Sequence, residues 1–331
     1  ENTKGKPVKI TPLNSADQSF SELQHWIQQV ADSHIQPRLA FACHEIPVEL
    51  DSGHTGYVLQ IRVAARLGLP SVVKYNHSIS FYVRRGSLAS RITDVYELRD
   101  AILSSQEHDE SIRDWRVNRI SKIIGGDTPV KLDDHRLLVM HLIPRSSFLR
   151  NDNLDIMRKM PLVRSSFHPI ENDAREQRPN LDGLIQHGSV GNDGRYDSYC
   201  QVFKCGAIES VYSSMVCSGN SQFQSNGNVW GIPSRYVQEE LVKATRDYLR
   251  GIQALEADGP VLLLLSLLSV KGLRLFVSNR DLHLRRNAHK YMFDRDNVLL
   301  PEVIVSDLET EAEKALQPVF DAVWQAAGIQ G

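Results

Sequence analysis

Apolar residues in the first part of the chain change from a helical spacing to a strand-like one. Phe20, Leu23, Ile27 and Val30 recur every three or four residues, which predicts a helix over residues 18–33. Two strands are then predicted by HEIPVEL and YVLQIRVA, which the turn-rich segment DSGHTG separates. A helix followed by neighbouring strands indicates a fold that mixes both kinds of element.

The segment ISFYVR alternates strictly between apolar and polar residues. A strand projects residues two apart onto the same face. Tyr82 and Arg84 therefore share one face, and Ile79, Phe81 and Val83 share the other. The pattern predicts a strand with a buried apolar face and a polar face open to solvent.

Two helices are predicted after this strand. Thr93 is placed to cap the first, which carries Val95, Leu98 and Ile102. The second runs from about residue 109 to 124 and ends at a pair of glycines.

The rest of the chain again mixes strands and helices. Its predicted elements are a strand within HRLLVMHLIPRSSF, a hairpin bending at Lys204 to Gly206, a helix near 234–257, a buried strand over 261–270, a strand within NVLLPEVIV and a closing helix containing Leu316 and Trp324. We expect linkers and loops at 151–195, 218–232 and 276–296. The fold class is α/β (α+β), with two lobes of mixed β-sheets flanked by helices. In this division residues 1–105 form the first lobe, 106–150 a connecting helix and strand, and 151–331 the C-terminal lobe.

The composition of the chain indicates where in the cell the protein is expected. The apolar run at 261–270 covers ten residues and is too short to span a membrane, so no membrane partner is expected. The four cysteines form no Cys-x-x-Cys pair, and no secretion signal is seen at the start of the chain. A cytoplasmic protein is the expectation.

Charge is unevenly distributed in a chain whose net charge is only −2. Residues 60–93 contain six basic residues and no acidic one. Such a segment attracts anions, and phosphate is the commonest candidate. Two alternatives are a solvated basic face that binds nothing, and pairing with the acidic region at residues 302–313.

Tyr82 and Arg84 suggest how a phosphate-bearing ligand is held. A phenol ring can stack on a base or sugar, and a guanidinium forks onto a phosphate. The alternative is that Arg84 and Arg85 pair with Asp94 and Glu97 at the corner between strand and helix. The candidate nucleic-acid-binding residues are Arg62, Lys74, Tyr82, Arg84, Arg85, Ser87 and Arg91.

Motifs for other chemistry are missing from the sequence. It contains no Gly-x-x-x-x-Gly-Lys-Ser/Thr loop for a nucleotide, no His-Glu-x-x-His zinc pattern and no Gly-x-Ser-x-Gly nucleophile turn. No cofactor is expected in this chain, and no residue is assigned to a metal.

The order of several segments carries a resemblance. FYVRRGSLASRITDVYELRDAIL is followed by WRVNRISKIIGGDTPV and LLVMHLIPRSSF, and later by PNLDGL, QVFKCGAIESV, DRDNVLLPEVIV and LQPVFDAVWQAAG. Together they cover most of the chain and resemble the bacterial Schlafen/AlbA-like DNA-binding family, whose members carry helix-turn-helix or ATP-binding labels. The resemblance implies that residues 1–105 are the C-terminal portion of a Schlafen/AlbA-like domain. The residues themselves give no support to ATP binding.

The departure from the family pattern leads to two hypotheses about function. The family's opening Glu-Phe-Lys strand and Ala-Asn-x-x-Gly-Gly segment do not occur here, so we expect the first third of the domain to be missing. One hypothesis is a nucleic-acid binder acting in transcriptional control or phage defence. The alternative is a metal-dependent endoribonuclease, because the resemblance implies that carboxylates holding a divalent metal lie in the missing part. A scaffold subunit, a homo-oligomer, and DNA or RNA as ligand all stay open.

Overall fold

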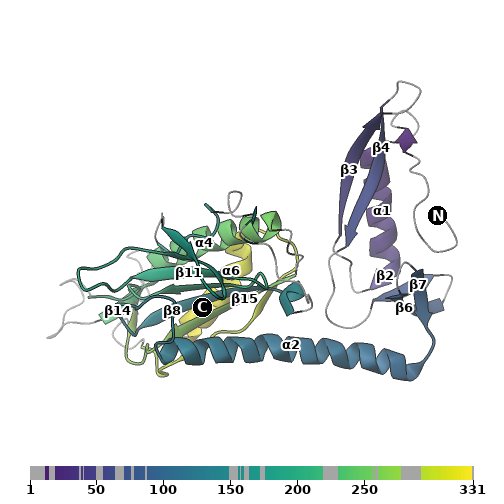
Figure 1. Cartoon of the computed structure of the whole chain (residues 1–331). Coiled ribbons are helices and arrows are strands. Elements are labelled where there is room, and N and C mark those ends of the chain that lie inside the picture. Colours follow the sequence, from purple (N-terminus) through teal and green to yellow (C-terminus); the bar gives the residue numbers. More distant parts are fainter. Residues whose placement is uncertain are drawn as a thin grey trace. The chain divides into compact units, whose positions relative to one another are not determined.

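The computed structural model divides the chain into two compact units, Glu1–Glu110 and Ser111–Gly331 (Figure 1). The residues that the structure describes are 12–14, 19–36, 39, 41–49, 55–63, 71–75, 78–85, 88–148, 156, 158–159, 164–171, 176–218, 230–255, 257, 260–276 and 292–329.

In the first unit, one helix lies along an antiparallel hairpin (Figure 1). The helix is α1, Phe20–His34, which confirms the prediction from apolar spacing. The strands are β1 (Leu13–Asn14), β3 (Phe41–Glu49) and β4 (Thr55–Val63), in the order β1-β4-β3. The ring of Phe20 meets the fully buried ring of Tyr57 edge to face, with centroids 5.9 Å apart. This contact joins the helix to the hairpin.

A second, four-stranded sheet in the first unit contains the basic segment. Its strands are β2 (Ile35–Gln36), β5 (Val72–Tyr75), β6 (Ser78–Arg85) and β7 (Leu88–Ile92), and all pair antiparallel in that order. The strand predicted around ISFYV is therefore confirmed as β6.

The expected division of β6 into a buried apolar and an open polar face is wrong at two positions. Ile79 is 61% exposed, whereas Ser80 is buried. Ile79 pairs with the exposed Lys74 next to the β5–β6 turn, where the face is open. Ser80 lies opposite Val73, on the face that also carries Tyr82, and is covered there. Packing at each position, rather than alternation alone, decides exposure.

Residues 95–124 form one helix, so the prediction of two helices is wrong. This helix, α2 (Val95–Ile124), begins where the carboxylate of Asp94 accepts a 3.0 Å hydrogen bond from the backbone N–H of Tyr96. Asp94, and not Thr93, therefore supplies the N-cap. The polar stretch SSQEHDE, which lacks a regular apolar spacing, contains no proline or glycine. The backbone helix continues through it without a break.

The second unit is organised around one eight-stranded sheet. Its strand order is β17-β15-β8-β12-β11-β10-β9, and β18 also pairs with β15, each pairing being antiparallel. The strands are β8 (Leu137–Pro144), β9 (Gln177–Pro179), β10 (Gly183–His187), β11 (Ser198–Phe203), β12 (Ile208–Tyr212), β15 (Val261–Leu268), β17 (Val298–Leu299) and β18 (Val303–Val305).

This sheet confirms two predictions and corrects another. The hairpin β11–β12 bends where predicted, with Gly206 at φ 93°, and β15 is buried along its whole length. The expected linker 151–195 is wrong over its last part, because β9 and β10 belong to the sheet. Strand β8, from the segment assigned as a connection, lies in the middle of the sheet.

Helices cover both faces of this sheet (Figure 1). On one face, Leu138, Met140 and Leu142 of β8 join a core with α4 (Ser234–Ala254) and α6 (Ala312–Ala326). On the other face, alternate β8 residues pack with the last part of α2. The three layers explain why the central strands are apolar on both sides.

Three short strands complete the second unit and make its sheets mixed. They are β13 (Cys217–Ser218), β14 (Trp230–Pro233) and β16 (Arg274–Phe276), and β14 and β16 run parallel. A 3-10 turn, η1 (Arg145–Phe148), follows β8. The α+β class with mixed sheets flanked by helices is therefore confirmed. In the described part of the chain, no helix is long and apolar enough to cross a membrane.

Candidate nucleic-acid interface

Strand register places Tyr82 directly opposite Arg91. Residues paired across two antiparallel strands project to the same side of the sheet, with Cβ atoms about 5 Å apart. Tyr82 is 45% exposed and Arg91 is exposed as well. Among the described residues, neither side chain has a hydrogen-bond or ion-pair partner. A phenol ring and a guanidinium are thus presented to solvent side by side.

The other candidate residues are distributed over two sheets. Position 84 is two residues from Tyr82 on β6 and shares its face. Lys74, paired with Ile79, and position 85 lie on the opposite face. Position 62 belongs to β4 in the other sheet, where it pairs with Ala42. The side chains at 62, 84 and 85, and the whole of Ser87, lie outside the described residues.

The acidic residues that were considered as partners for the basic segment have other contacts. Glu302 forms a forked pair with Arg113, with its shorter contact at 2.7 Å, and Glu311 lies 2.8 Å from Lys314. The carboxylate of Asp94 caps α2. These contacts leave the pairing of Arg84 and Arg85 with Glu97 as an open alternative.

Tyr75 is a further candidate residue, which the sequence alone does not single out. It pairs with Ser78, which lies on the same face of β6 as Tyr82, and its side chain is 63% exposed. Its ring lies against that of His34, with centroids 6.2 Å apart. The segment VVKY suggests a strand, but only the register of the β5–β6 hairpin shows which face Tyr75 occupies.

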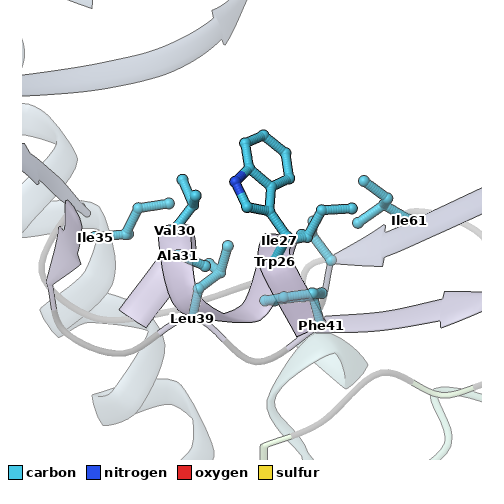
Figure 2. Close-up of a pocket in the computed structure, with 9 residues that line it drawn as sticks. Trp26, Ile27, Val30, Ala31, Ile35, Leu39, Phe41 and Ile61 are labelled. Atoms are coloured by element: carbon cyan, nitrogen blue, oxygen red, sulfur yellow. The ribbon is translucent and has the colours of Figure 1, made fainter. Parts of the chain in front are cut away.

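A small apolar pocket lies between α1 and the β3–β4 hairpin (Figure 2). Its volume is about 210 Å³, and Trp26 at its rim is 59% exposed. The side chains that line it are Trp26, Ile27, Val30, Ala31, Ile35, Leu39, Phe41, Ile61 and Val63. Because this lining carries no acid, base or nucleophile, the pocket offers apolar contact and no chemistry.

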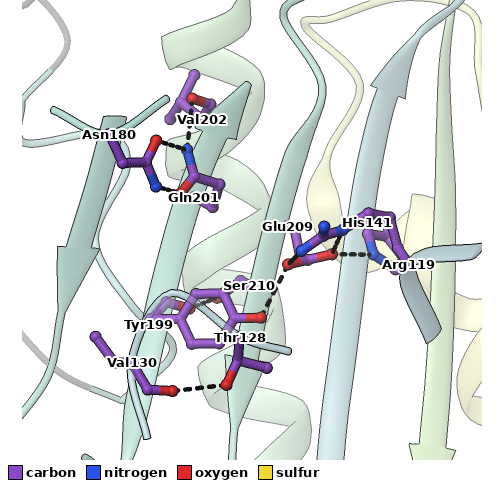
Figure 3. A network of polar contacts seen from close by, with 10 residues as sticks. All are labelled: Arg119, Thr128, Val130, His141, Asn180, Tyr199, Gln201, Val202, Glu209 and Ser210. Carbon is purple, nitrogen blue, oxygen red and sulfur yellow. Dashed lines mark hydrogen bonds and ion pairs between the residues drawn. The ribbon is translucent and has the colours of Figure 1, made fainter. Parts of the chain in front are cut away.

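The second unit contains a buried polar network centred on Glu209 (Figure 3). The guanidinium of Arg119 on α2 donates two 2.8 Å hydrogen bonds to the Glu209 carboxylate. Tyr199 donates a third at 2.9 Å, and Nε2 of His141 lies 3.0 Å from the same carboxylate. Glu209, His141 and Tyr199 have no solvent exposure.

Charge pairing dominates the ionisation of this network. Burial alone would raise the pKa of Glu209, but the hydrogen bonds from Arg119 and His141 lower it to about 2. Burial lowers the pKa of His141 despite the nearby carboxylate. A neutral His141 donating through Nε2 to a charged Glu209 fits both directions. The network holds the last part of α2 on the sheet, and none of its members lines the pocket of Figure 2.

No metal centre is formed by the described residues, among which no three His, Cys, Asp or Glu side chains converge. Cys200 is fully buried, and burial raises the pKa of its thiol to about 12, so it is a poor nucleophile.

Comparison of the chain with protein-family models, with curated proteins and with solved structures found no match. The face carrying Tyr82 and Arg91 is therefore the candidate site, on chemistry alone.

Proposed function

We propose that the protein binds nucleic acid through the face of the β2-β5-β6-β7 sheet that carries Tyr82 and Arg91. The observation that carries the proposal is their direct pairing across β6 and β7, with both side chains exposed. Position 84 adds a second arginine to the same face. A guanidinium matches a phosphate and a phenol ring matches a base or sugar.

The charge of the surrounding segment supports a polyanionic ligand. Residues 60–93 carry six basic residues without an acidic one, although the whole chain has a net charge of −2. A local excess of positive charge draws in a phosphate backbone and makes affinity depend on salt. The resemblance to the Schlafen/AlbA-like family points to the same class of ligand, which includes both DNA and RNA.

The test is binding of the chain to labelled tRNA, single-stranded DNA and duplex DNA over a salt series. An Arg84→Ala/Arg91→Ala variant should bind more weakly and lose about one unit of salt slope for each phosphate contact removed. Arg99→Ala is the matched control, because Arg99 is an exposed arginine of the same unit on α2. Absence of binding, or an unchanged slope in the double variant, would refute the proposal.

The endoribonuclease alternative places its metal-binding carboxylates outside this chain, so it predicts no cutting of structured RNA by these 331 residues, with or without a divalent metal. Adding Mg²⁺ or Mn²⁺ to the tRNA arm and following the length of the RNA on a gel checks this. Metal-dependent cutting by this chain would contradict that placement of the carboxylates. Within the described residues no carboxylate cluster supports that chemistry, so binding without cutting is the expected result for this chain.

A further inference from the structure

Two exposed tyrosines share one face of the four-stranded sheet. Tyr75 pairs with Ser78, and Ser78, Ser80 and Tyr82 alternate onto the same side of β6. The side chains of Tyr75 and Tyr82 are 63% and 45% exposed. Between the two rings the same face carries Val73 and the buried Ser80, so Tyr75 and Tyr82 are two exposed aromatic side chains on either side of a covered stretch.

The spacing of the two rings fits more than one nucleotide. Four residues along a strand cover about 13 Å, and the step to the next strand makes the separation of the two Cα atoms about 14 Å. Four-stranded sheets that carry surface aromatics stack two or three bases in this way. The geometry is that of two platforms on one surface.

The two tyrosine rings have different neighbouring side chains. The ring of His34 supports Tyr75 from one side at 6.2 Å, and the Ser33 hydroxyl lies 2.7 Å from His34 Nδ1. More than half of the Tyr75 side chain is still open to solvent. Tyr82 instead has Arg91 beside it as its cross-strand neighbour. Tyr75 thus has an aromatic neighbour, and Tyr82 has a guanidinium beside it that can bind a phosphate.

This arrangement favours unpaired bases. In a duplex the bases stack on one another and show only their edges in the grooves, which admit a helix or a two-stranded ribbon. Tyrosine rings on a sheet face can reach base faces only where the bases are unpaired. We propose that this face binds a single-stranded nucleic acid, with bases stacked on Tyr75 and Tyr82 and a phosphate on Arg91. The inference rests on the proposed function and adds the class of ligand.

The experiment compares oligo(dT), oligo(U) and the oligo(dA)·oligo(dT) duplex by fluorescence anisotropy at one salt concentration. The single strands should bind more tightly than the duplex. Tyr75→Leu and Tyr82→Leu should each weaken single-strand binding roughly tenfold, with a smaller effect on the duplex. Tyr75→Phe and Tyr82→Phe keep the ring and should bind like the wild type. The dT and U arms separate DNA from RNA.

Tyr96→Leu is the matched control, because Tyr96 is 72% exposed but lies on α2. Circular dichroism checks that each variant is folded. If the leucine variants leave single-strand binding unchanged, or weaken both kinds of probe equally while Arg91→Ala still weakens binding, the stacking inference fails and the proposed function stands. If the wild type binds none of the probes, both fail.

Discussion

Glu209 is a carboxylate without solvent contact, and its three partners come from three different elements. Arg119 lies on α2, His141 on β8 and Tyr199 on β11. Such a group is costly to bury unless every charge is paired. On the sheet face of the first unit, Tyr82 and Arg91 are in the opposite situation, exposed and without partners among the described residues. The buried pairing around Glu209 has a structural role.

Replacing Glu209 by Gln should destabilise the second unit by about 3–5 kcal/mol, because Arg119 would be left buried without its counter-charge. Urea unfolding followed by tryptophan fluorescence measures this, since the ring of Trp115 contacts His141 at 5.2 Å. Glu239→Gln is the control: Glu239 pairs with Arg235 on the exposed side of α4 and should change little. Equal effects of the two substitutions would contradict the structural role of Glu209.

The same network makes stability depend on pH. The pKa of His141 is lowered from 6.5 in the folded state, and that of Glu209 from 4.5 to about 2. The unfolded chain therefore binds protons that the folded chain does not, and acidification favours unfolding. The loss should begin below about pH 6.5 and continue from about 4.5 towards 2. Urea midpoints measured across this window, with Glu209→Gln showing a shallower fall below 4.5, would verify it; a flat profile would contradict it.

At the scale of elements, a glycine inside a helix marks a close contact. Gly251 lies in α4, where alanine would be favoured by about 1 kcal/mol. A Cβ at this position would lie 2.5 Å from Cζ of Phe167, whose ring is fully buried. The contact sets how closely α4 approaches the segment that follows β8. Packing therefore outweighs helix propensity here.

Gly251→Ala should destabilise the second unit by about 1–3 kcal/mol, since Phe167 cannot move aside without repacking. Urea unfolding provides the measurement. Adding Phe167→Leu should recover part of the loss by making room for the new methyl group. Gln253→Ala, at an exposed position of the same helix, should be neutral or slightly stabilising. Stabilisation by Gly251→Ala alone would show that the contact is looser than described.

At the scale of the whole molecule, the chain forms two compact units, and the hydrophobic core clusters among the described residues all lie in the second. The boundary, between Glu110 and Ser111, falls inside α2. The last part of this helix supplies Ile112, Ile120 and Ile123 to the core of the second unit. A unit with its own core is expected to fold alone.

Residues 111–331 should therefore form a folded fragment that unfolds cooperatively. Dispersed amide resonances that match those of the full chain would demonstrate this. A fragment of residues 125–331 is the contrasting case, because it lacks Arg116 and Arg119 and leaves Glu209 without its cation. It should be less stable by several kcal/mol. Poor dispersion in the longer fragment would show that the second unit depends on the first.

Local sequence patterns were enough to predict most of the helices and strands. The apolar spacing of α1, the apolar run of β15 and the turn residues of the β11–β12 hairpin each depend on neighbours in sequence, and each was predicted. The predicted break within α2 was wrong, because a loss of apolar spacing does not end a helix that no proline or glycine interrupts. Strands β9 and β10 were missed because they are short and lie among polar residues.

The sequence by itself determined the mixed fold class, the basic segment and the shared face of Tyr82 and position 84, since strand alternation is a local property. Only tertiary structure decided that Arg91 and Tyr75 join that face, because strand register depends on pairing between strands. Pairing also places Lys74 on the opposite face, whereas alternation along β6 already places position 85 there. The Glu209 network likewise required the fold, which brings residues 119, 141, 199 and 209 together from distant parts of the chain.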